Sequence, residues 1–515
     1  MINDQSPKRF CTTGLCVPGK HYMVDTSERI RTIIGDYIDR GDYFTINRAR
    51  QFGKTTTLNL LRRNLVPAYI VFSLSFEGMG DELFDSNWTL FEGLRRIFMK
   101  QIEEQSPELS RILAQQIEKP FETDDFRQRV TKLCTESEKP VVLLIDEIDK
   151  APTFEPFLRF LGLLRDMFMK RQAEDIPTFQ SVILAGVHDI KNLKNRIRPE
   201  EEHRYYSPWN IAVNFDMDMS FHPEDIATML ADYEADHHTE MDIPAVSQRI
   251  YYWTNGYPFL VSRTCQMIDD VVRDSPHEAL LTWDANGVDE AVKDIISTQK
   301  NLLFDDMVKN LISHPDLDAL TRQILLSDIE VPYALTDVTQ DIGMMYGIYA
   351  VNSDRKIVIS NKIFATTLLN HYSAARDIRE KLNASDADAP MFIHDGILDM
   401  ETVLKRFGQF MKSEYRDEDS DFIEREGRLL FLSFLRPIIN GKGNYAVESE
   451  TRGSRRMDIV VFYGGKEYII ELKIWRGESY EANGMAQLAE YLKGKDAKRG
   501  WLLSFANLQK SPREG

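Results

Sequence analysis

Two apolar runs joined by a pair of glycines, residues 457–463 and 466–475, constrain the C-terminal part of this chain most strongly. The intervening Gly464-Gly465 favours a two-residue β-hairpin turn, which sets how the two strands pair. In that register Asp458 lies directly opposite Glu471, with about 4.5–5.5 Å between their Cβ atoms. Like charges repel at this distance, so we expect a cation to lie between the two carboxylates.

Lys473 follows Glu471 by two residues and therefore belongs to the same face of its strand. Two carboxylates beside a cationic side chain are the groups needed for a Mg²⁺-activated water to attack a phosphodiester. This prediction depends on the turn at the glycine pair. A slip of one residue moves Glu471 and Lys473 to the opposite face of the strand.

A second motif lies near the N-terminus, where a short strand over residues 43–47 precedes a loop ending in Gly53-Lys54-Thr55. An apolar helix follows to residue 65, and this order is typical of a phosphate-binding loop. We expect Lys54 to neutralise the β- and γ-phosphates of ATP and Thr55 to hold Mg²⁺. The pattern G-x-x-x-x-G-K-[ST] is broken at its first position by Arg48. The predicted nucleotide-binding residues of the loop are Arg48, Arg50, Gln51, Phe52, Gly53, Lys54, Thr55 and Thr56.

A wholly apolar run over residues 141–145 ends in Asp146 and Glu147. It predicts a buried parallel strand with carboxylates at the end where α/β sheets bind ligands. Asp146 would hold Mg²⁺ through water and Glu147 would polarise the attacking water; the alternative is a core strand that meets a polar loop. After a strand over 181–185, His188 is the candidate sensor of the γ-phosphate, or else an ordinary loop histidine.

The remaining pattern predicts the fold class and the domains. Strands at 69–74, 181–185 and 211–215 alternate with helices, which favours a doubly wound parallel α/β sheet in residues 1–220. Helical periodicity over 221–285 predicts a helical lid above the nucleotide. Helices and then a hairpin, at 347–351 and 356–359, predict a winged-helix-like region over 286–385. A linker of small and acidic residues precedes an α/β domain over 391–515, which begins with helices at 397–412 and 419–435.

Composition limits the partners and the cellular location that we expect for these domains. The chain has 515 residues and a net charge of −18, which argues against a surface built for non-specific nucleic-acid binding. The stretch from residue 421 onward is mildly basic, which suits either nucleic acid or simple solvation. We expect a cytoplasmic protein without membrane spans, because no apolar run is long enough and no signal sequence is evident. Four cysteines predict no disulfide framework.

The N-terminal motifs resemble those of the bacterial AAA-ATPase-like family, a branch of P-loop NTPases related to the signal-transducing STAND ATPases. This family commonly has arginine where Arg48 stands. Residues 255–258, Asn-Gly-Tyr-Pro, are similar to the G-x-P element in the lid of STAND proteins. The segments that carry the main resemblance are residues 21–25, 44–56, 144–147 and 185–190.

The C-terminal part resembles the PD-(D/E)XK nuclease superfamily. Asp458 matches the motif aspartate, Glu471-Leu472-Lys473 matches E-x-K, and Gln487 with Tyr491 matches a Q-x-x-x-Y helix. Glu426 is similar to an extra glutamate on the first helix. The resemblance implies that Asp458, Glu471 and the Leu472 carbonyl hold Mg²⁺ and that Lys473 orients water or stabilises charge. It also implies that Gln487 positions the nucleophile or the strand. The neighbouring Arg452, Arg455 and Arg456 either hold phosphates or pair with Glu448 and Glu450.

These features together predict an ATP-binding and ATP-hydrolysing protein whose nucleotide state controls a Mg²⁺-dependent nuclease. The partner would be DNA or RNA, and self-assembly into a homo-oligomer is possible. One alternative is a non-catalytic STAND-like ATPase switch whose C-terminal domain only binds nucleic acid. A translocating motor is disfavoured, because there is no helicase motif set and little basic surface outside the tail.

Overall fold

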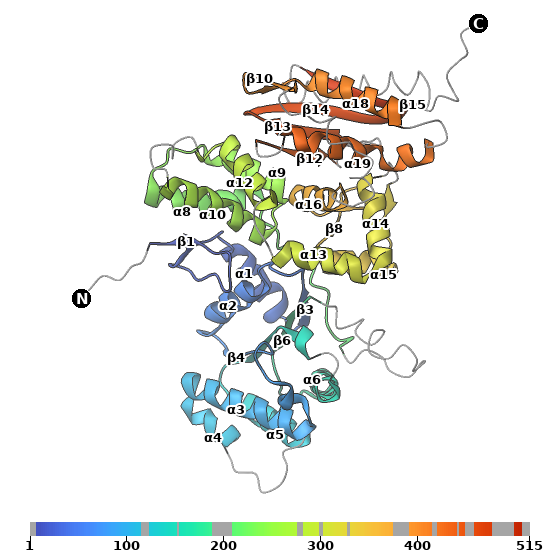
Figure 1. Ribbon diagram of the computed structural model, residues 1–515. Coiled ribbons are helices and arrows are strands. Elements are labelled where there is room, and N and C mark those ends of the chain that lie inside the picture. Colours follow the sequence, from blue (N-terminus) through green and yellow to red (C-terminus); the bar gives the residue numbers. More distant parts are fainter. Residues whose placement is uncertain are drawn as a thin grey trace. The chain divides into compact units, whose positions relative to one another are not determined.

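The computed structural model divides into two compact units, Met1–Ser220 and Phe221–Gly515 (Figure 1). Each unit is described here by itself. The finer divisions at residues 285 and 385–391 stay predictions. The structure describes residues 7–114, 123–151, 154–187, 209–274, 282–297, 302–326, 330–373, 391–414, 420–439, 442–448, 458–475 and 499–506.

The first unit contains a four-stranded, wholly parallel sheet in the order β3-β6-β5-β4. This confirms the predicted α/β class with a parallel sheet. The expected strand over 211–215 is wrong: within the described residues it is a single parallel bridge between Val213 and Phe44, because only the Val213 amide donates to β3, at Tyr43 O. The strands are β3 (Tyr43–Asn47), β4 (Ile70–Ser75), β5 (Val141–Asp146) and β6 (Ser181–Gly186).

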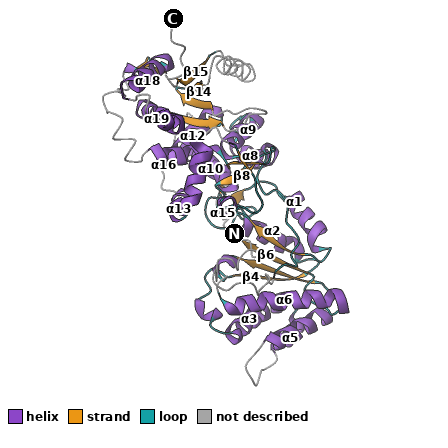
Figure 2. Ribbon diagram, turned by 90° about the vertical axis from the view of Figure 1, so that its right-hand side faces the viewer, coloured by secondary structure: helices purple, strands orange, loops and turns teal. Residues whose placement is uncertain are grey.

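Helices cover both faces of this sheet, which explains why every residue of β5 and β6 is buried. Figure 2 shows α1 and α2 on one side and α3, α5 and α6 on the other. Alternate residues of β5 enter separate cores: Leu143 packs with α3 and α6, and Leu144 packs with α1 and α2. The helices are α1 (Ser27–Ile33), α2 (Lys54–Leu65), α3 (Asn87–Gln105), α4 (Pro107–Ala114), α5 (Thr123–Glu136) and α6 (Glu155–Glu174).

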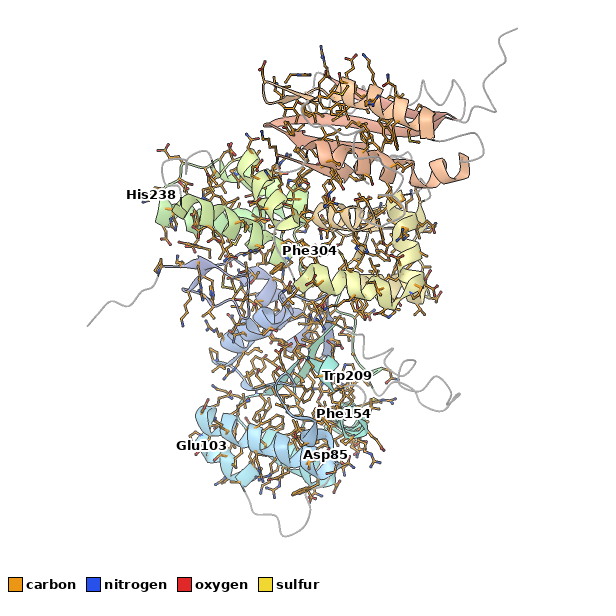
Figure 3. The ribbon with its side chains drawn as sticks, in the orientation of Figure 1. Asp85, Glu103, Phe154, Trp209, His238 and Phe304 are labelled. Carbon is orange, nitrogen blue, oxygen red and sulfur yellow. The ribbon has the colours of Figure 1, made fainter. Side chains whose placement is uncertain are left out.

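Aromatic side chains fix the segments that flank the sheet. Trp209, labelled in Figure 3, is fully buried, and its indole N–H donates to Thr45 Oγ1 of β3 at 3.1 Å. Phe154, at the start of α6, stacks on Phe84 with 4.8 Å between ring centroids. The first contact anchors residue 209 to the middle of β3, and the second anchors the start of α6 to Phe84.

The second unit begins with helices and includes a small sheet. The predicted hairpin is confirmed: β8 pairs antiparallel with β9, with Val351 opposite Ile357. Strand β7 adds to the other side of β9. The elements are α8 (Pro223–His237), α9 (Ile243–Thr254), α10 (Pro258–Asp274), α12 (Ala285–Ser297), α13 (Leu302–Ser313), α14 (Pro315–Leu326), β7 (Val331–Pro332), α15 (Val338–Met345), β8 (Tyr349–Val351), β9 (Lys356–Ile359) and α16 (Lys362–Ser373).

The same unit contains a second four-stranded sheet in the order β12-β13-β14-β15. Its first three strands are antiparallel, and β15 is parallel to β14. The helix expected from residue 397 begins later, because residues 397 and 398 form strand β11 and Asp399 caps the helix by accepting from the Thr402 amide. The elements are β10 (Ile393–His394), β11 (Ile397–Leu398), α18 (Met400–Glu414), α19 (Ser420–Ile439), β12 (Gly443–Glu448), β13 (Asp458–Tyr463), β14 (Lys466–Trp475) and β15 (Gly500–Ala506).

Helices α9 and α16 pack directly on this sheet. The Thr366 hydroxyl of α16 donates to the Tyr445 carbonyl of β12 at 3.1 Å, and the Tyr445 hydroxyl donates to Asn370 at 2.9 Å. On α9, the Trp253 ring lies 5.2 Å from the ring of Phe462 in β13. The helical region and the C-terminal sheet therefore share one packed body.

Candidate functional site

The loop after β3 has the backbone shape of a phosphate site. Gln51 and Gly53 both adopt left-handed conformations, with φ of +57° and +81°, and α2 begins at the next residue, Lys54. Residues that alternate between right- and left-handed conformations turn their amides into one concavity, which suits an anion. The N-terminus of α2 contributes further unpaired amides and the positive end of its dipole.

The Lys54 side chain binds the backbone of this loop. Its side chain is buried, and the ammonium donates to the carbonyls of Arg48 and Ala49, each at 2.9 Å. Burial lowers the pKa of Lys54, and the charges of Glu147, Asp149 and Asp146 oppose that shift. The lysine of the loop and the acids after β5 therefore lie in one electrostatic environment, as the two sequence motifs predict.

The turn after β5 is unusual at Glu147. This residue is not glycine, yet it has φ +52° and ψ +44°, a conformation that costs about 1–3 kcal/mol and occurs mainly at functional sites. Its amide donates to Asp146 Oδ1 at 2.9 Å. Burial, and then the charge of Asp146, raises the pKa of the Glu147 carboxyl, while Lys54 lowers it. A raised pKa makes this carboxylate a better proton acceptor than an ordinary glutamate.

Asp149 is a site residue that the sequence reasoning missed. It accepts a hydrogen bond from the Val187 amide, at the end of β6 and directly before His188. Gly186 permits this approach, because a Cβ there would lie 2.5 Å from Ile148 and 3.0 Å from Asp149. The signal was present as a third acid three residues after Asp146. His188 itself lies outside the described residues.

The other predicted residues of the loop differ in their surroundings. Thr55, Arg50 and Gln51 are exposed, while Phe52 packs at the edge of the core shared by α1 and α2. Thr56 accepts a hydrogen bond from the Cys16 amide at 3.4 Å, so the N-terminal segment contacts the first turn of α2. Arg48 directs its guanidinium to backbone carbonyls of residues 47, 215 and 217.

In the second unit, the register predicted for the glycine hairpin is confirmed. Asp458 pairs with Glu471, and Tyr463 pairs with Lys466. Glu448 on β12 pairs with Asp458 from the other side, so three acidic positions form a row across β12, β13 and β14. The sequence reasoning considered Glu448 only as a partner for arginine and missed its place in this row.

Two further motif residues, Leu472 and Lys473, follow Glu471 on β14. Glu471 and Leu472 are both buried, and Lys473 pairs with Ser504 of β15, two positions along the strand from Glu471. Glu426 belongs to α19, which precedes the sheet. Gln487, Tyr491, Arg452, Arg455 and Arg456 lie outside the described residues.

No helix in the described part of the chain has the length and hydrophobicity needed to cross a bilayer. The described residues also contain no group of three or more His, Cys, Asp or Glu side chains arranged to hold a metal ion. The side chains of Glu448 and Asp458 lie outside the described part of the structure.

Several solved structures are similar to this chain. A Walker-type ATPase of Pyrococcus abyssi is 12% identical, covering 70% of this chain and 99% of its own length, with a TM-score of 0.43. The RuvB Holliday junction branch migration motor of Thermotoga maritima is 14% identical, covering 68% and 94%, with a TM-score of 0.33. The ORC2 protein of Aeropyrum pernix, in ADPNP–ADP complexes, is 11% identical, covering 67% and 92%, with a TM-score of 0.35.

No curated protein matches the chain. A family model described as an AAA-like domain matches residues 21–344, which include the phosphate-binding loop, the acids after β5 and the helices of α8 to α15. This match spans well over half of the 515 residues. The chain therefore belongs to the AAA-like domain family.

Proposed function

We propose that the first unit binds and hydrolyses ATP and that its nucleotide state controls a Mg²⁺-dependent nuclease in residues 391–515. Family membership and the environment of Lys54 support ATP binding. The observation that carries the nuclease is the pairing of Asp458 with Glu471, which is the register that the E-x-K motif requires. The partner is a nucleic acid, DNA or RNA.

In the ATP site, the backbone of residues 48–53 and the first turn of α2 surround the phosphates. Lys54 would exchange its two carbonyl acceptors for phosphate oxygens, and Thr55 and Asp146 are the residues that would hold Mg²⁺. Arg50, Gln51, Phe52 and Thr56 line the loop. Glu147 accepts the proton of the attacking water, which its raised pKa favours. His188 senses the γ-phosphate; it follows Val187 in the sequence, whose amide donates to Asp149.

In the nuclease site, the donor set fits Mg²⁺, since carboxylate and carbonyl oxygens are its preferred protein ligands. Asp458, Glu471 and the Leu472 carbonyl are the residues that would hold the ion. A bound Mg²⁺ would supply an activated water and neutralise charge on the phosphate. Lys473 orients that water or stabilises charge on phosphorus, and Gln487 positions the nucleophile.

The alternative function is a STAND-like switch that binds nucleic acid without cutting it. One observation favours the nuclease over this alternative. Three acidic positions lie side by side across β12, β13 and β14, where their mutual repulsion opposes folding in the absence of a cation. A domain that only bound a polyanion would gain nothing from such a row, which repels phosphate as well.

The test uses purified full-length protein with Mg²⁺ and labelled DNA and RNA, with and without ATP. We expect cleavage that responds to ATP in the wild type. Asp458→Asn should lose cleavage by about 100-fold or more and keep ATP hydrolysis, whereas Lys54→Ala should lose ATP hydrolysis and the response to ATP. Glu401→Gln, which alters an exposed carboxylate of α18, is the matched control.

The outcomes separate the two functions. Binding of nucleic acid without cleavage by the wild type would establish the switch and reject the nuclease. Cleavage by Asp458→Asn at the wild-type rate would show that the catalytic site lies elsewhere. Normal ATP turnover by Lys54→Ala would reject the assignment of the phosphate-binding loop.

A further inference from the structure

Arg48 is the one residue of the phosphate-binding loop that breaks the sequence pattern. Its side chain binds backbone carbonyls. Its guanidinium donates to Asn47 O at 2.8 Å, to Met217 O at 2.6 Å and to Phe215 O at 3.5 Å. It also lies over the Phe215 ring, 5.6 Å from the centroid. These bonds commit the guanidinium to a segment 167 to 169 residues further along the chain.

That segment, residues 215–220, is the end of the first unit, and we call it the connector. Phe215 and Met219 are buried in the core with Phe44, on which Phe215 stacks at 5.5 Å. Arg29 of α1 holds the far end, donating to Met219 O at 3.2 Å and Ser220 O at 2.9 Å. Two arginines therefore anchor the connector through its carbonyls, one from the phosphate-binding loop and one from α1.

The backbone of Arg48 takes part in the nucleotide site itself. Its carbonyl accepts a charge-assisted bond from Lys54, and its amide donates to Gly186 O at the end of β6, at 3.2 Å. Lysines at this position bind the β- and γ-phosphates when nucleotide is present. Arrival of those phosphates therefore removes a bond from the residue whose side chain holds the connector.

The residue after the connector is fixed in the second unit. The Phe221 amide donates to Gly256 O at 2.9 Å, and Gly256 has φ +69°. A Cβ on Gly256 would lie only 2.3 Å from Phe221 O, so the two backbones touch. Asn255 donates to Ser360 O, just before α16, at 3.0 Å. Displacement of Phe221 would thus reach the turn between α9 and α10 directly.

We propose that Arg48 is a positioning residue that transmits nucleotide occupancy from the phosphate-binding loop, along the connector, to the turn at residues 255–257. This role rests on the ATP-binding part of the proposed function and is independent of the nuclease. It also explains the departure from the loop pattern. Glycine at this position would leave the loop backbone intact but could not hold the Phe215 and Met217 carbonyls.

The experiment is hydrogen–deuterium exchange on the full chain, with and without Mg²⁺ and a non-hydrolysable ATP analogue. In the wild type we expect nucleotide to change exchange at residues 215–221 and 255–257 by about 10-fold, the factor that one charge-assisted hydrogen bond supplies. Arg48→Gly, which restores the loop pattern, should still bind a fluorescent ATP analogue but lose this response. Arg48→Lys should keep part of it, because an ammonium lacks the planar fork of donors with which a guanidinium spans carbonyls of separate segments.

Two further variants complete the design. Arg40→Ala removes an exposed arginine of the same unit and should respond as the wild type does. Arg29→Ala releases the other end of the connector without touching the loop, so it should bind nucleotide and lose the response at 255–257. Arg29→Ala decides the matter if Arg48→Gly does not fold.

A wild-type response in Arg48→Gly, or in Arg29→Ala, would overturn the proposal. Loss of nucleotide binding by folded Arg48→Gly would also overturn it, because the side chain would then be a phosphate ligand. A wild type that responds to nucleotide and cuts no nucleic acid rejects the nuclease and leaves the role of Arg48 intact. A wild type whose cleavage depends on ATP without a response at 255–257 rejects only the role of Arg48.

Discussion

At the scale of single residues, several features that lower the stability of the fold coincide at one position in the turn after β5. Glu147 has a left-handed backbone, a half-buried carboxyl and three acidic neighbours within electrostatic range, Asp146, Asp149 and Glu77. Each of these terms opposes folding, and Lys54 offsets only part of them. Strain and like charge at one residue are typical of catalytic positions, where function is kept at the expense of folding stability.

Glu147→Gln should therefore abolish ATP hydrolysis while nucleotide binding is kept. Because the folded pKa of Glu147 is raised, the folded state holds this proton more tightly than the unfolded state does. The ionised carboxylate thus lowers stability above the folded pKa, and that cost disappears as the pH falls below it. Thermal melting at pH 8 should give Glu147→Gln a midpoint equal to or above that of the wild type, and the difference should shrink towards pH 5.

The control for this prediction is Glu103→Gln, on the exposed side of α3. It should leave ATP hydrolysis unchanged. Turnover by Glu147→Gln comparable to that of the wild type would remove Glu147 from the reaction. In the wild type, the acid limb of the ATPase pH profile should lie above the range of an ordinary glutamate, about 4.3.

At the scale of elements, two contacts hold the helices of the second unit to their neighbours. The first is the turn between α9 and α10, where Gly256 meets the Phe221 backbone. The second joins α9 to α12 and to the hairpin of β13 and β14. There the Arg249 guanidinium forms a fork with Asp289, at 2.7 and 2.6 Å, and reaches Glu467 at 3.0 Å.

Gly256→Ala should destabilise the second unit by about 1–3 kcal/mol or more, because it adds strain at a positive φ as well as a clash with Phe221 O. Urea unfolding followed by circular dichroism measures this cost. Gly408→Ala, in α18, is the matched control: a Cβ there meets nothing within 4 Å, so it should stabilise by about 0.5–1 kcal/mol. Equal effects of the two substitutions would contradict the close approach at Gly256.

Arg249→Ala should cost about 3–5 kcal/mol, because it leaves the largely buried Asp289 without its cation. Burial already raises the pKa of Asp289 and Arg249 opposes this, so removing the arginine raises it further. The loss of stability should therefore be larger at pH 8 than at pH 5, where protonation relieves the unpaired charge. Arg322→Ala breaks a more exposed pair and should cost about 1 kcal/mol or less. A loss for Arg249→Ala that does not vary with pH would contradict this account.

At the scale of the whole molecule, the chain has two packed bodies, and the candidate nuclease strands belong to the same body as the helical region. Contacts between Trp253 and Phe462, and between Thr366 and Tyr445, join these regions. A nucleotide signal that reached α9 would therefore act on a helix already packed against β13.

Calorimetry should show two unfolding transitions. An ATP analogue at 100 times its Kd should stabilise only the first unit, by about 2.7 kcal/mol, and so raise the midpoint of that transition alone. Lys54→Ala should lose this shift. The C-terminal sheet should unfold together with α9 and α16. A third, independent transition from the C-terminal sheet would show that these contacts do not join the two regions into one cooperative body.

The local sequence pattern was sufficient to predict many of the strands of this protein and the pairing within its two hairpins. The four strands of the parallel sheet and the hairpin at 347–359 follow from runs of apolar residues and their turn residues. The pairing of Asp458 with Glu471 follows from a two-residue turn alone, because a turn of known length leaves one register. The strand predicted at 211–215 was wrong because local pattern has a limit: an apolar run does not reveal whether a neighbouring strand has room to pair.

The sequence by itself determined the family motifs, the strand order along the chain and the acids that face one another across the hairpin, since all of these depend on residues close in sequence. Only the tertiary structure decided the partners of Arg48 and Arg249. Apart from the neighbouring Asn47 carbonyl, the acceptors of Arg48 lie 167 and 169 residues away, and those of Arg249 lie 40 and 218 residues away. Long charged side chains take whichever acceptors the packed fold brings to them, and no periodicity in the chain encodes that choice.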